Sequence, residues 1–328
     1  MKKILSLALA FAMFALLLTG CNAPQEQGQE VLPNLMVMAG PTGVGAAKLL
    51  TDHANAAENE KILASATVVE NNEDVTSALI NGEADIAAVA TNVASMLYNK
   101  TGGNIQVLAL NTMGVLYILE KGNSVNSMAD LKGKTVYATG KGANPEYVLN
   151  YLLTASGVAV EEVDIQWMTA QEVTAAMTTN SEAICMLPVP AATALMIKDS
   201  QVRQAISLSA VWDQLGNGAL SQGCIVVRKD YAEKNPQAVA NFLKAYEASI
   251  AYMNEEANRA DAAALVAQHG ITANAAIAAK AIPQCNLTYI TGSRMKEILS
   301  AFLAVMHTAN PASIGGALPG DDFYYAVG

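Results

Sequence analysis

The strongest constraint on the fold is a pattern of short, uncharged apolar runs that alternate with amphipathic stretches and that occurs twice. In the first series, runs suited to strands lie at residues 35–39, 62–69, 86–90 and 105–110. Helical patterns lie between them at 44–57 and 73–81, and the second ends at Asn81-Gly82, a typical helix stop. Uncharged apolar runs between helices are typical of buried strands. This pattern predicts an α/β fold, with Thr91 or Asn92 capping the helix after the third strand.

The pattern then restarts in the middle of the chain. Strand patterns of the second series lie at residues 135–138, 163–167 and 183–187. The glycine-rich turn 140–143 precedes Asn144, which we predict to be the N-cap of a helix that opens with Pro145. Thr169 and Glu172 have the spacing of a capping box, which predicts the start of a further helix.

The two series overlay without a gap, with residues 73–97 on residues 171–195. This shared order predicts two similar lobes, although an alanine-rich α/β chain can also align with itself by chance. The last strand of the first series is predicted to continue through residues 113–120. A strand pattern at 220–227 then precedes helical patterns at 236–254, 258–268, 272–280 and 293–308.

The second series is therefore expected to form a lobe (lobe II) that is inserted into the lobe formed by the first series and the C-terminal part of the chain (lobe I). The predicted bounds are 33–113 and 220–328 for lobe I and 114–219 for lobe II. Because the chain would cross twice between the lobes, the sequence predicts a hinge with a cleft beside it.

The N-terminus has the layout of an export signal. Lys2 and Lys3 precede an apolar run that is too short to span a bilayer comfortably, and the run closes with Leu18-Thr19-Gly20-Cys21. These four residues resemble the lipobox of bacterial lipoproteins, which implies cleavage before Cys21 and a lipid on its thiol. We therefore expect a signal peptide at 1–20, a flexible tether at 21–32, and a protein anchored at the extracytoplasmic face of the cell membrane. The alternative is an ordinary secretory signal in which Cys21 is incidental.

Composition argues against several classes of protein. A formal net charge of −10 is unsuited to nucleic acid, whose phosphates require a basic face. The later cysteines, Cys185, Cys224 and Cys285, show no C-x-x-C spacing, so a zinc or thioredoxin-like site has no support. They could form one disulfide or remain buried thiols. The sequence contains no G-x-S-x-G and no H-E-x-x-H motif, and we predict no catalytic residue, metal or cofactor.

Ligands of α/β sheets bind beyond the carboxyl ends of strands, where helices begin. That rule selects a ring of loops whose side chains are nearly all neutral, with Lys141 as its cation. Each loop could instead be a plain turn, Lys141 a solvated side chain and Met113 a core residue. The predicted ligand-binding residues are Gly40, Pro41, Thr42, Gly43, Thr91, Asn92, Thr112, Met113, Gly140, Lys141, Ala143, Asn144, Leu187, Pro188, Pro190 and Gln222.

Three segments carry a resemblance to a known family. They are Asn-Gly-Glu-Ala-Asp-Ile at 81–86, Ala-Asp-Leu-Lys-Gly-Lys-Thr-Val at 129–136, and Val-Val-Arg-Lys-Asp-Tyr at 226–231, followed by Asn235-Pro236 and a long helix. With the lipobox, they resemble the NMT1/THI5-like solute-binding lipoproteins of ABC importers. The resemblance implies a class II periplasmic-binding-protein fold, in which a monomer holds a small solute in the cleft between its lobes. It also implies delivery of the solute to a membrane permease and its ATPase.

The resemblance leaves the solute open among sulfonates, nitrogenous compounds and pyrimidine-like compounds. The nearly neutral ring departs from what a sulfonate or nitrate would need, although helix N-termini alone can hold an anion. Two other functions remain possible. One is a THI5-like enzyme of pyrimidine precursor synthesis, which would need a reachable cysteine or histidine such as Cys224. The other is a lipoprotein sensor domain.

Overall fold

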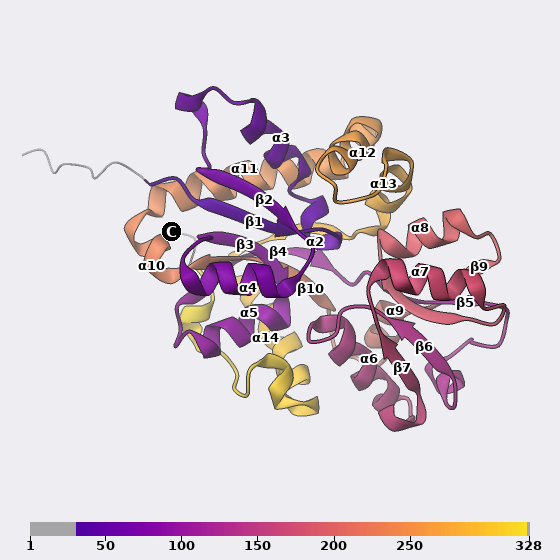
Figure 1. Cartoon of the computed structure of the whole chain (residues 1–328). Helices are drawn as coiled ribbons and strands as arrows, with labels where there is room; N and C mark the ends of the chain where they lie inside the picture. The colour runs from indigo at the N-terminus through magenta and orange to yellow at the C-terminus, as the bar shows by residue number, and fades with distance from the viewer. Residues whose placement is uncertain (1–30, 327–328) are drawn as a thin grey trace, which may run out of the picture. The chain divides into compact units, whose positions relative to one another are not determined.

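Two β-sheets covered by helices form two lobes in the computed structural model, which describes residues 31–326 (Figure 1). Lobe I contains a six-stranded sheet and lobe II a five-stranded sheet. The predicted signal peptide at 1–20, the lipid on Cys21 and nearly all of the tether at 21–32 lie outside the described residues. None of the helices formed by residues 31–326 has the length and apolar character needed to cross a membrane.

The sheet of lobe I is mixed rather than fully parallel. Its order is β11-β4-β10-β3-β1-β2, where β1 pairs parallel with β2 and β3, and β10 lies antiparallel between β3 and β4. The predicted strand 86–90 is confirmed, and its first four residues are buried. The strands are β1 (Asn34–Met38), β2 (Ser65–Val69), β3 (Ile86–Ala90), β4 (Ile105–Met113), β10 (Ser221–Arg228) and β11 (Leu287–Ile290).

The sheet of lobe II repeats this arrangement. Its order is β7-β6-β8-β5-β9, where β6 pairs parallel with β7 and β8, and β5 lies antiparallel between β8 and β9. In each lobe the strand that pairs antiparallel with β3 or β8, namely β10 or β5, is the first strand after the chain crosses from the other lobe. The strands are β5 (Leu116–Lys121), β6 (Thr135–Ala138), β7 (Asp164–Trp167), β8 (Ile184–Pro188) and β9 (Val202–Ser207).

Helices cover both faces of the two sheets (Figure 1). Those of lobe I are α2 (Pro41–Val44), α3 (Ala47–Asn55), α4 (Asn72–Asn81), α5 (Thr91–Lys100), α10 (Lys229–Lys234), α11 (Pro236–Asn254), α12 (Arg259–Gln268), α13 (Ala275–Ala281) and α14 (Gly292–Ala309). Those of lobe II are α6 (Asn144–Ala155), α7 (Ala170–Thr179), α8 (Ala191–Lys198) and α9 (Leu208–Gln214). The lobes touch where α8 packs on α13 and where α6 packs on α14.

The predicted internal repeat is confirmed. At the offset found in the sequence, α4 and β3 fall residue for residue on α7 and β8. The capping box of Thr169 and Glu172 is also present, with Glu172 N donating to Thr169 Oγ1 at 3.3 Å. At the same offset α5 falls on α8, which ends at the corresponding residue, Lys198, but begins two residues later, at Ala191.

The helix predicted at 44–57 is instead two helices, α2 and α3. The cause is Ser249 of α11, whose hydroxyl is bonded to two backbone groups, Gly45 O and Leu49 N, that would otherwise bond to each other. Ser249 Oγ donates to Gly45 O at 2.7 Å and accepts from Leu49 N at 3.1 Å. In an uninterrupted helix, Leu49 N–H would donate to Gly45 O. The bridging hydroxyl therefore divides the segment in two.

The strand predicted at 113–120 is also divided. Strand β4 ends at Met113, and β5 begins at Leu116 in the other sheet. Asn286 holds the crossing, because its backbone oxygen accepts from Met113 N at 3.1 Å and its Nδ2 donates to Gly114 O at 2.6 Å. The sequence did not predict β9, α9 or β11, which are short and only partly buried.

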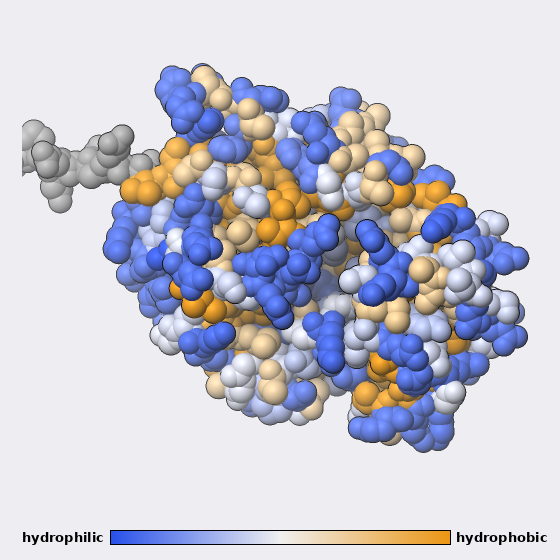
Figure 2. Space-filling model, viewed as in Figure 1, coloured by the Kyte–Doolittle hydropathy of each residue, from blue (hydrophilic) through white to orange (hydrophobic). Residues whose placement is uncertain are grey.

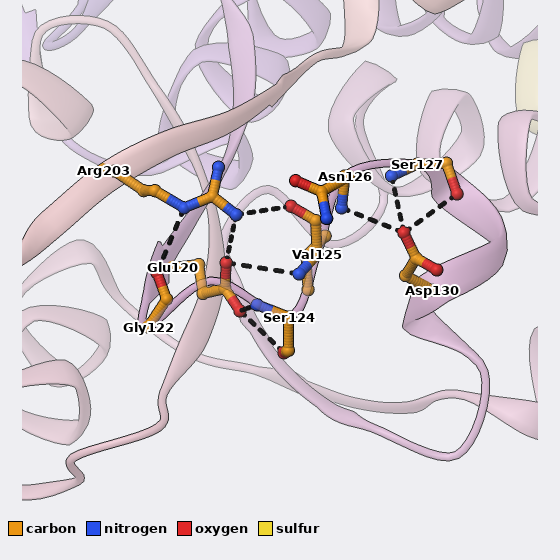
Figure 3. A network of polar contacts seen from close by, with 8 residues as sticks. All are labelled: Glu120, Gly122, Ser124, Val125, Asn126, Ser127, Asp130 and Arg203. Carbon is orange, nitrogen blue, oxygen red and sulfur yellow. Dashed lines mark hydrogen bonds and ion pairs between the residues drawn. The ribbon is translucent and has the colours of Figure 1, made fainter.

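Ion pairs between a buried carboxylate and a partly exposed arginine lie at the end of each sheet that is farther from the other lobe. In lobe II, Glu120 is 1% exposed and accepts from Ser124 N at 2.6 Å and from Arg203 NH2 at 2.6 Å (Figure 3). Burial alone would raise the pKa of Glu120. Hydrogen bonds from Ser124, Val125 and Arg203 outweigh it, and the pKa is lowered. In lobe I, Asp85 accepts from Asn34 N at 2.9 Å and pairs with Arg228.

Candidate functional site

The predicted loops of lobe I gather at one edge of its sheet. Gly223 of β10 pairs with Ala90 of β3 and with Thr112 of β4, so the end of β3, the end of β4 and the start of β10 are neighbours. The loop after β1 folds over this edge, because Thr112 Oγ1 donates to Pro41 O at 3.4 Å. Four predicted positions from distant parts of the chain, Pro41, Thr91, Thr112 and Gln222, therefore lie at one place.

The backbone of this edge is crowded at Gly223. A Cβ there would lie 2.5 Å from Thr42 Cγ2 and 2.6 Å from Asn111 Oδ1, so only glycine fits without a shift. Asn111 Nδ2 donates to Thr42 O at 3.1 Å and to Tyr246 Oη at 2.9 Å, which fixes the loop on the sheet. Asn111 of β4 thus positions Thr42.

The side chain of Asn144 joins the two lobes. The side chain of Asn144, at the start of α6, donates to Thr91 Oγ1 at 2.9 Å and to Gln222 O at 2.8 Å, and it accepts from Asn92 N at 3.3 Å. Thr91 Oγ1 in turn donates to Ser221 O at 3.0 Å. The side chains of Thr91, Asn92 and Asn144 are fully buried.

These contacts correct two predicted helix caps, Thr91 or Asn92 for one helix and Asn144 for another. The N-cap residues of α5 and α6 are Ala90 and Ala143, and neither helix start has a side-chain cap from its own segment. Thr91, Asn92 and Asn144 are helical residues whose side chains point to other elements. Asn92 Nδ2, for example, donates to Ser313 O at 3.1 Å.

The loops of lobe II are held by different means. Gly140 has φ +88°, and a Cβ there would lie 2.5 Å from the Pro145 ring, so glycine is required on both counts. Gly142 N donates to Glu146 Oε2 at 2.6 Å, which tightens the turn around Lys141. Lys141 is exposed and forms no ion pair with any residue from 31 to 326. The sequence did not predict a role for Glu146, although its place one turn into α6 is typical of a residue that reaches back to a helix start.

The other lobe II loop lies against the first crossing. Pro188 pairs with Leu116, and Val189 N donates to Val115 O at 3.0 Å. Among all the predicted residues, nine are buried, namely Gly43, Thr91, Asn92, Thr112, Ala143, Asn144, Leu187, Pro190 and Gln222. The half-buried ones are Gly40, Pro41, Thr42, Met113, Gly140 and Pro188.

Several buried polar atoms on β4, α5, α8 and β10 have no hydrogen-bond partner within residues 31–326. They are Asn92 Oδ1, Asn111 Oδ1, Thr193 Oγ1, Ser221 Oγ and Gln222 Nε2. An unpaired buried polar atom costs about 1–3 kcal/mol, so any arrangement that supplies a partner is favoured. The sequence did not single out Ser221 and Thr193, which are one and three residues from predicted positions.

The predicted loops carry few charged side chains. Their polar side chains are hydroxyls and amides, and the nearby charges are those of Lys141 and Glu146. In Figure 2 the surface is hollowed near α2, between elements of the two lobes, and pale atoms of intermediate hydropathy lie inside the hollow. Such a site can bind by hydrogen bonds to neutral groups.

A separate cavity of about 750 Å³ lies between α6 and α14, and none of the predicted residues lines it. Its walls include Tyr147, Asn150 and Tyr151 of lobe II and Val305 and Thr308 of lobe I. This cavity therefore also borders both lobes.

The cysteines are poorly placed for chemistry. Cys185, Cys224 and Cys285 are buried free thiols, so no disulfide joins them. Burial raises the pKa of the Cys224 thiol far above its ordinary value, which disfavours the reactive thiolate. No group of histidine, cysteine and carboxylate side chains within residues 31–326 has the arrangement of a metal site.

The fold is that of the periplasmic binding proteins, as the sequence predicted. An ABC transporter structure from Parabacteroides distasonis shares 24% identity at a TM-score of 0.74, over 90% of this chain and 98% of that one. The periplasmic aliphatic sulphonate binding protein SsuA of Escherichia coli shares 18% identity at a TM-score of 0.68, over 88% of this chain and 96% of that one. The periplasmic nitrate-binding protein NrtA of Synechocystis shares 15% identity at a TM-score of 0.54, over 73% and 66%.

The sequence itself identifies the family. Residues 69–260 match the family model described as NMT1/THI5 like. Because this match covers more than half of the chain, the chain belongs to the NMT1/THI5-like family, and the predicted resemblance is confirmed. A search of curated proteins found no match.

Proposed function

We propose that the protein is the extracytoplasmic solute-binding protein of an ABC importer. It captures a small organic solute between its two lobes and delivers it to a membrane permease that is driven by an ATPase. The observation that carries this proposal is the meeting of neutral hydrogen-bonding groups from both lobes at one edge, where the chain also crosses between the lobes. Proteins with this fold that are described as sulfonate- and nitrate-binding support the same role.

The proposed organisation follows the sequence. Residues 1–20 are a signal peptide, Cys21 carries the lipid, and 21–32 form the tether to the extracytoplasmic face of the membrane. Lobe I comprises 33–113 and 220–328, and lobe II comprises 114–219. The protein acts as a monomer, because a cleft formed by its own two lobes needs no second copy.

The proposed solute site contains the half-buried loop Gly40–Gly43, Thr112 and Met113 on lobe I, with Gly140, Lys141 and Pro188 facing it from lobe II. These groups offer hydroxyls, backbone N–H groups and one cation. A polar solute of low charge, such as a nitrogenous or pyrimidine-like compound, fits this chemistry better than a sulfonate, which would need stronger donors.

The test is native mass spectrometry of freshly purified protein, which weighs any bound solute, followed by calorimetry with that compound. We expect Thr42→Trp to weaken capture by at least about tenfold, because an indole does not fit against Gly223 and must displace the loop or enter the cleft. Ser77→Trp, at an exposed position on α4, is the control and should bind as the wild type does. Unchanged affinity in Thr42→Trp would contradict the proposed place of the solute.

An enzyme of pyrimidine precursor synthesis is the rival function. It would need a reachable nucleophile or base, and Cys224 is fully buried within β10. Incubation of the protein with its bound compound, followed by mass spectrometry, separates the two functions, because an enzyme would yield product. A sensor role predicts that no permease and ATPase are encoded beside this protein.

A further inference from the structure

The Asn144 amide is the most highly connected side chain between the lobes. It is 0% exposed, and both ends of the amide are used. Its Nδ2 donates to Thr91 Oγ1 at 2.9 Å and to Gln222 O at 2.8 Å, while its Oδ1 accepts from Asn92 N at 3.3 Å. A third oxygen, Ser221 O, lies 3.4 Å from Nδ2. Every partner belongs to lobe I, whereas Asn144 is the first residue of α6 in lobe II.

One of these bonds replaces a helix cap. The first N–H groups of an α-helix have no acceptor within the helix, and a polar N-cap side chain usually supplies one. The N-cap of α5 is Ala90, which has no polar side-chain atom. Asn144 Oδ1 accepts the N–H of Asn92, the second residue of α5. The start of α5 is therefore capped by a residue of the other lobe.

The position of Asn144 relative to the sheet separates it from the proposed solute loops. Its partners lie at the start of α5 and on the backbone at 221–222. The loop at Thr42 lies over Gly223 and is bonded to Asn111 instead. No hydrogen bond joins Asn144 to Thr42 or Thr112 in the part of the chain described. The predicted ring thus divides into a solute-facing part and a second part, Thr91, Asn92, Asn144 and Gln222, which with Ser221 forms a lobe-joining cluster.

We propose that Asn144 is a positioning residue that couples closure of the lobes to the start of α5, rather than a residue that contacts the solute. This inference rests on the proposed function, because a closing cleft is what the lobe-joining cluster would act on. Without solute the lobes exchange between closed and open arrangements, and the Asn144 bonds raise the closed fraction. Each time the lobes separate, water replaces Asn144 as the acceptor of Asn92 N–H. A solute gains affinity from every contact that favours the closed arrangement, including contacts it does not itself make.

The inference is tested directly by hydrogen exchange of the Asn92 amide, measured by NMR on full-length protein freed of solute. In Asn144→Ala, we expect this amide to exchange at least about tenfold faster, because its acceptor is gone. Small-angle scattering of the same sample should show a larger radius of gyration. Thr91→Val should show a smaller change of the same kind, and the double variant should be little worse than Asn144→Ala, since both remove one network.

Gln171→Ala is the matched control, because it removes an exposed amide on α7 of the same lobe. Exchange at Asn92 and the radius of gyration should then stay as in the wild type. A circular dichroism spectrum like that of the wild type shows that each variant is folded.

Unchanged Asn92 exchange in folded Asn144→Ala would overturn the inference. So would a loss of solute affinity in that variant without any change in exchange or in the radius of gyration, since that pattern marks a direct solute contact. The proposed function fails by a different result, namely native mass spectra in which the wild type carries no solute. Exchange and scattering are measured without solute, so the two failures are distinguishable.

Discussion

The two ends of the sheets differ in the chemistry that holds them. The far ends carry ion pairs whose carboxylates are buried, with Glu120 and Arg203 in lobe II and Asp85 and Arg228 in lobe I. The ends that face the other lobe carry neutral groups such as Thr91, Thr112, Asn144 and Gln222. In β10 the contrast appears within a single strand, which starts at Ser221 beside the other lobe and ends at Arg228.

We infer that the two ends of each sheet have different roles. A buried ion pair is costly to break, because removal of one partner leaves an uncompensated charge. Such pairs suit parts of a lobe that stay together. Neutral hydrogen bonds exchange for water at a net cost of about 0.5–1.5 kcal/mol each, which suits surfaces that separate and rejoin. We therefore expect changes at the far ends to alter stability and changes at the facing ends to alter closure and capture.

The largest expected effect is at the far end of lobe II. Glu120→Ala should lower the free energy of unfolding by about 3 kcal/mol, because Arg203 and the N–H groups of Ser124 and Val125 lose their acceptor. Urea unfolding measures the change, with Glu182→Ala, an exposed carboxylate of the same lobe, as the control. Solute affinity at a temperature where the variant is folded should stay within about twofold of the wild type, and a larger loss would break the contrast.

The next effect is at the facing end of lobe I. Gly223→Ala should lower the free energy of unfolding by about 1–3 kcal/mol, because the new methyl group overlaps Thr42 and Asn111. The displaced loop should also weaken solute capture, which calorimetry measures. Full capture in a destabilised Gly223→Ala protein would place the solute elsewhere.

A smaller effect is expected from pH. The folded pKa of Glu120 lies below its ordinary value, so its contribution to stability is complete above about pH 5 and is lost as the pH falls through the lowered value. The free energy of unfolding of the wild type should thus decrease on acidification. In Glu120→Gln the decrease should be shallower. If the free energy of unfolding fell equally steeply with pH in both proteins, Glu120 would not be the cause of the decrease.

The fold was predictable because it depends on local patterns. Uncharged runs such as 86–90 and 183–187 and the capping box at Thr169 are read within a few residues. Strand β11 and the break at Gly45 were not predictable, since they depend on contacts with distant segments. Ser249 breaks the helical ladder at Gly45 from 204 residues away.

The site was predictable only in outline. The rule that loops at strand ends bind ligands selected residues that the structure does bring together at one edge. It could not separate the residues that join the lobes from those that we propose to face a solute. Asn144 follows a glycine turn and precedes proline, so its sequence predicts a cap for its own helix. It caps α5 instead, because folding brings Asn92 within reach of its amide.

The most direct test of a cleft that closes on a solute is small-angle scattering of the wild type, with and without the compound identified by native mass spectrometry. We predict a smaller radius of gyration in the presence of that compound, and no such decrease with Thr42→Trp at the same concentration. An unchanged radius of gyration for a wild-type protein that calorimetry shows to be saturated would contradict the account.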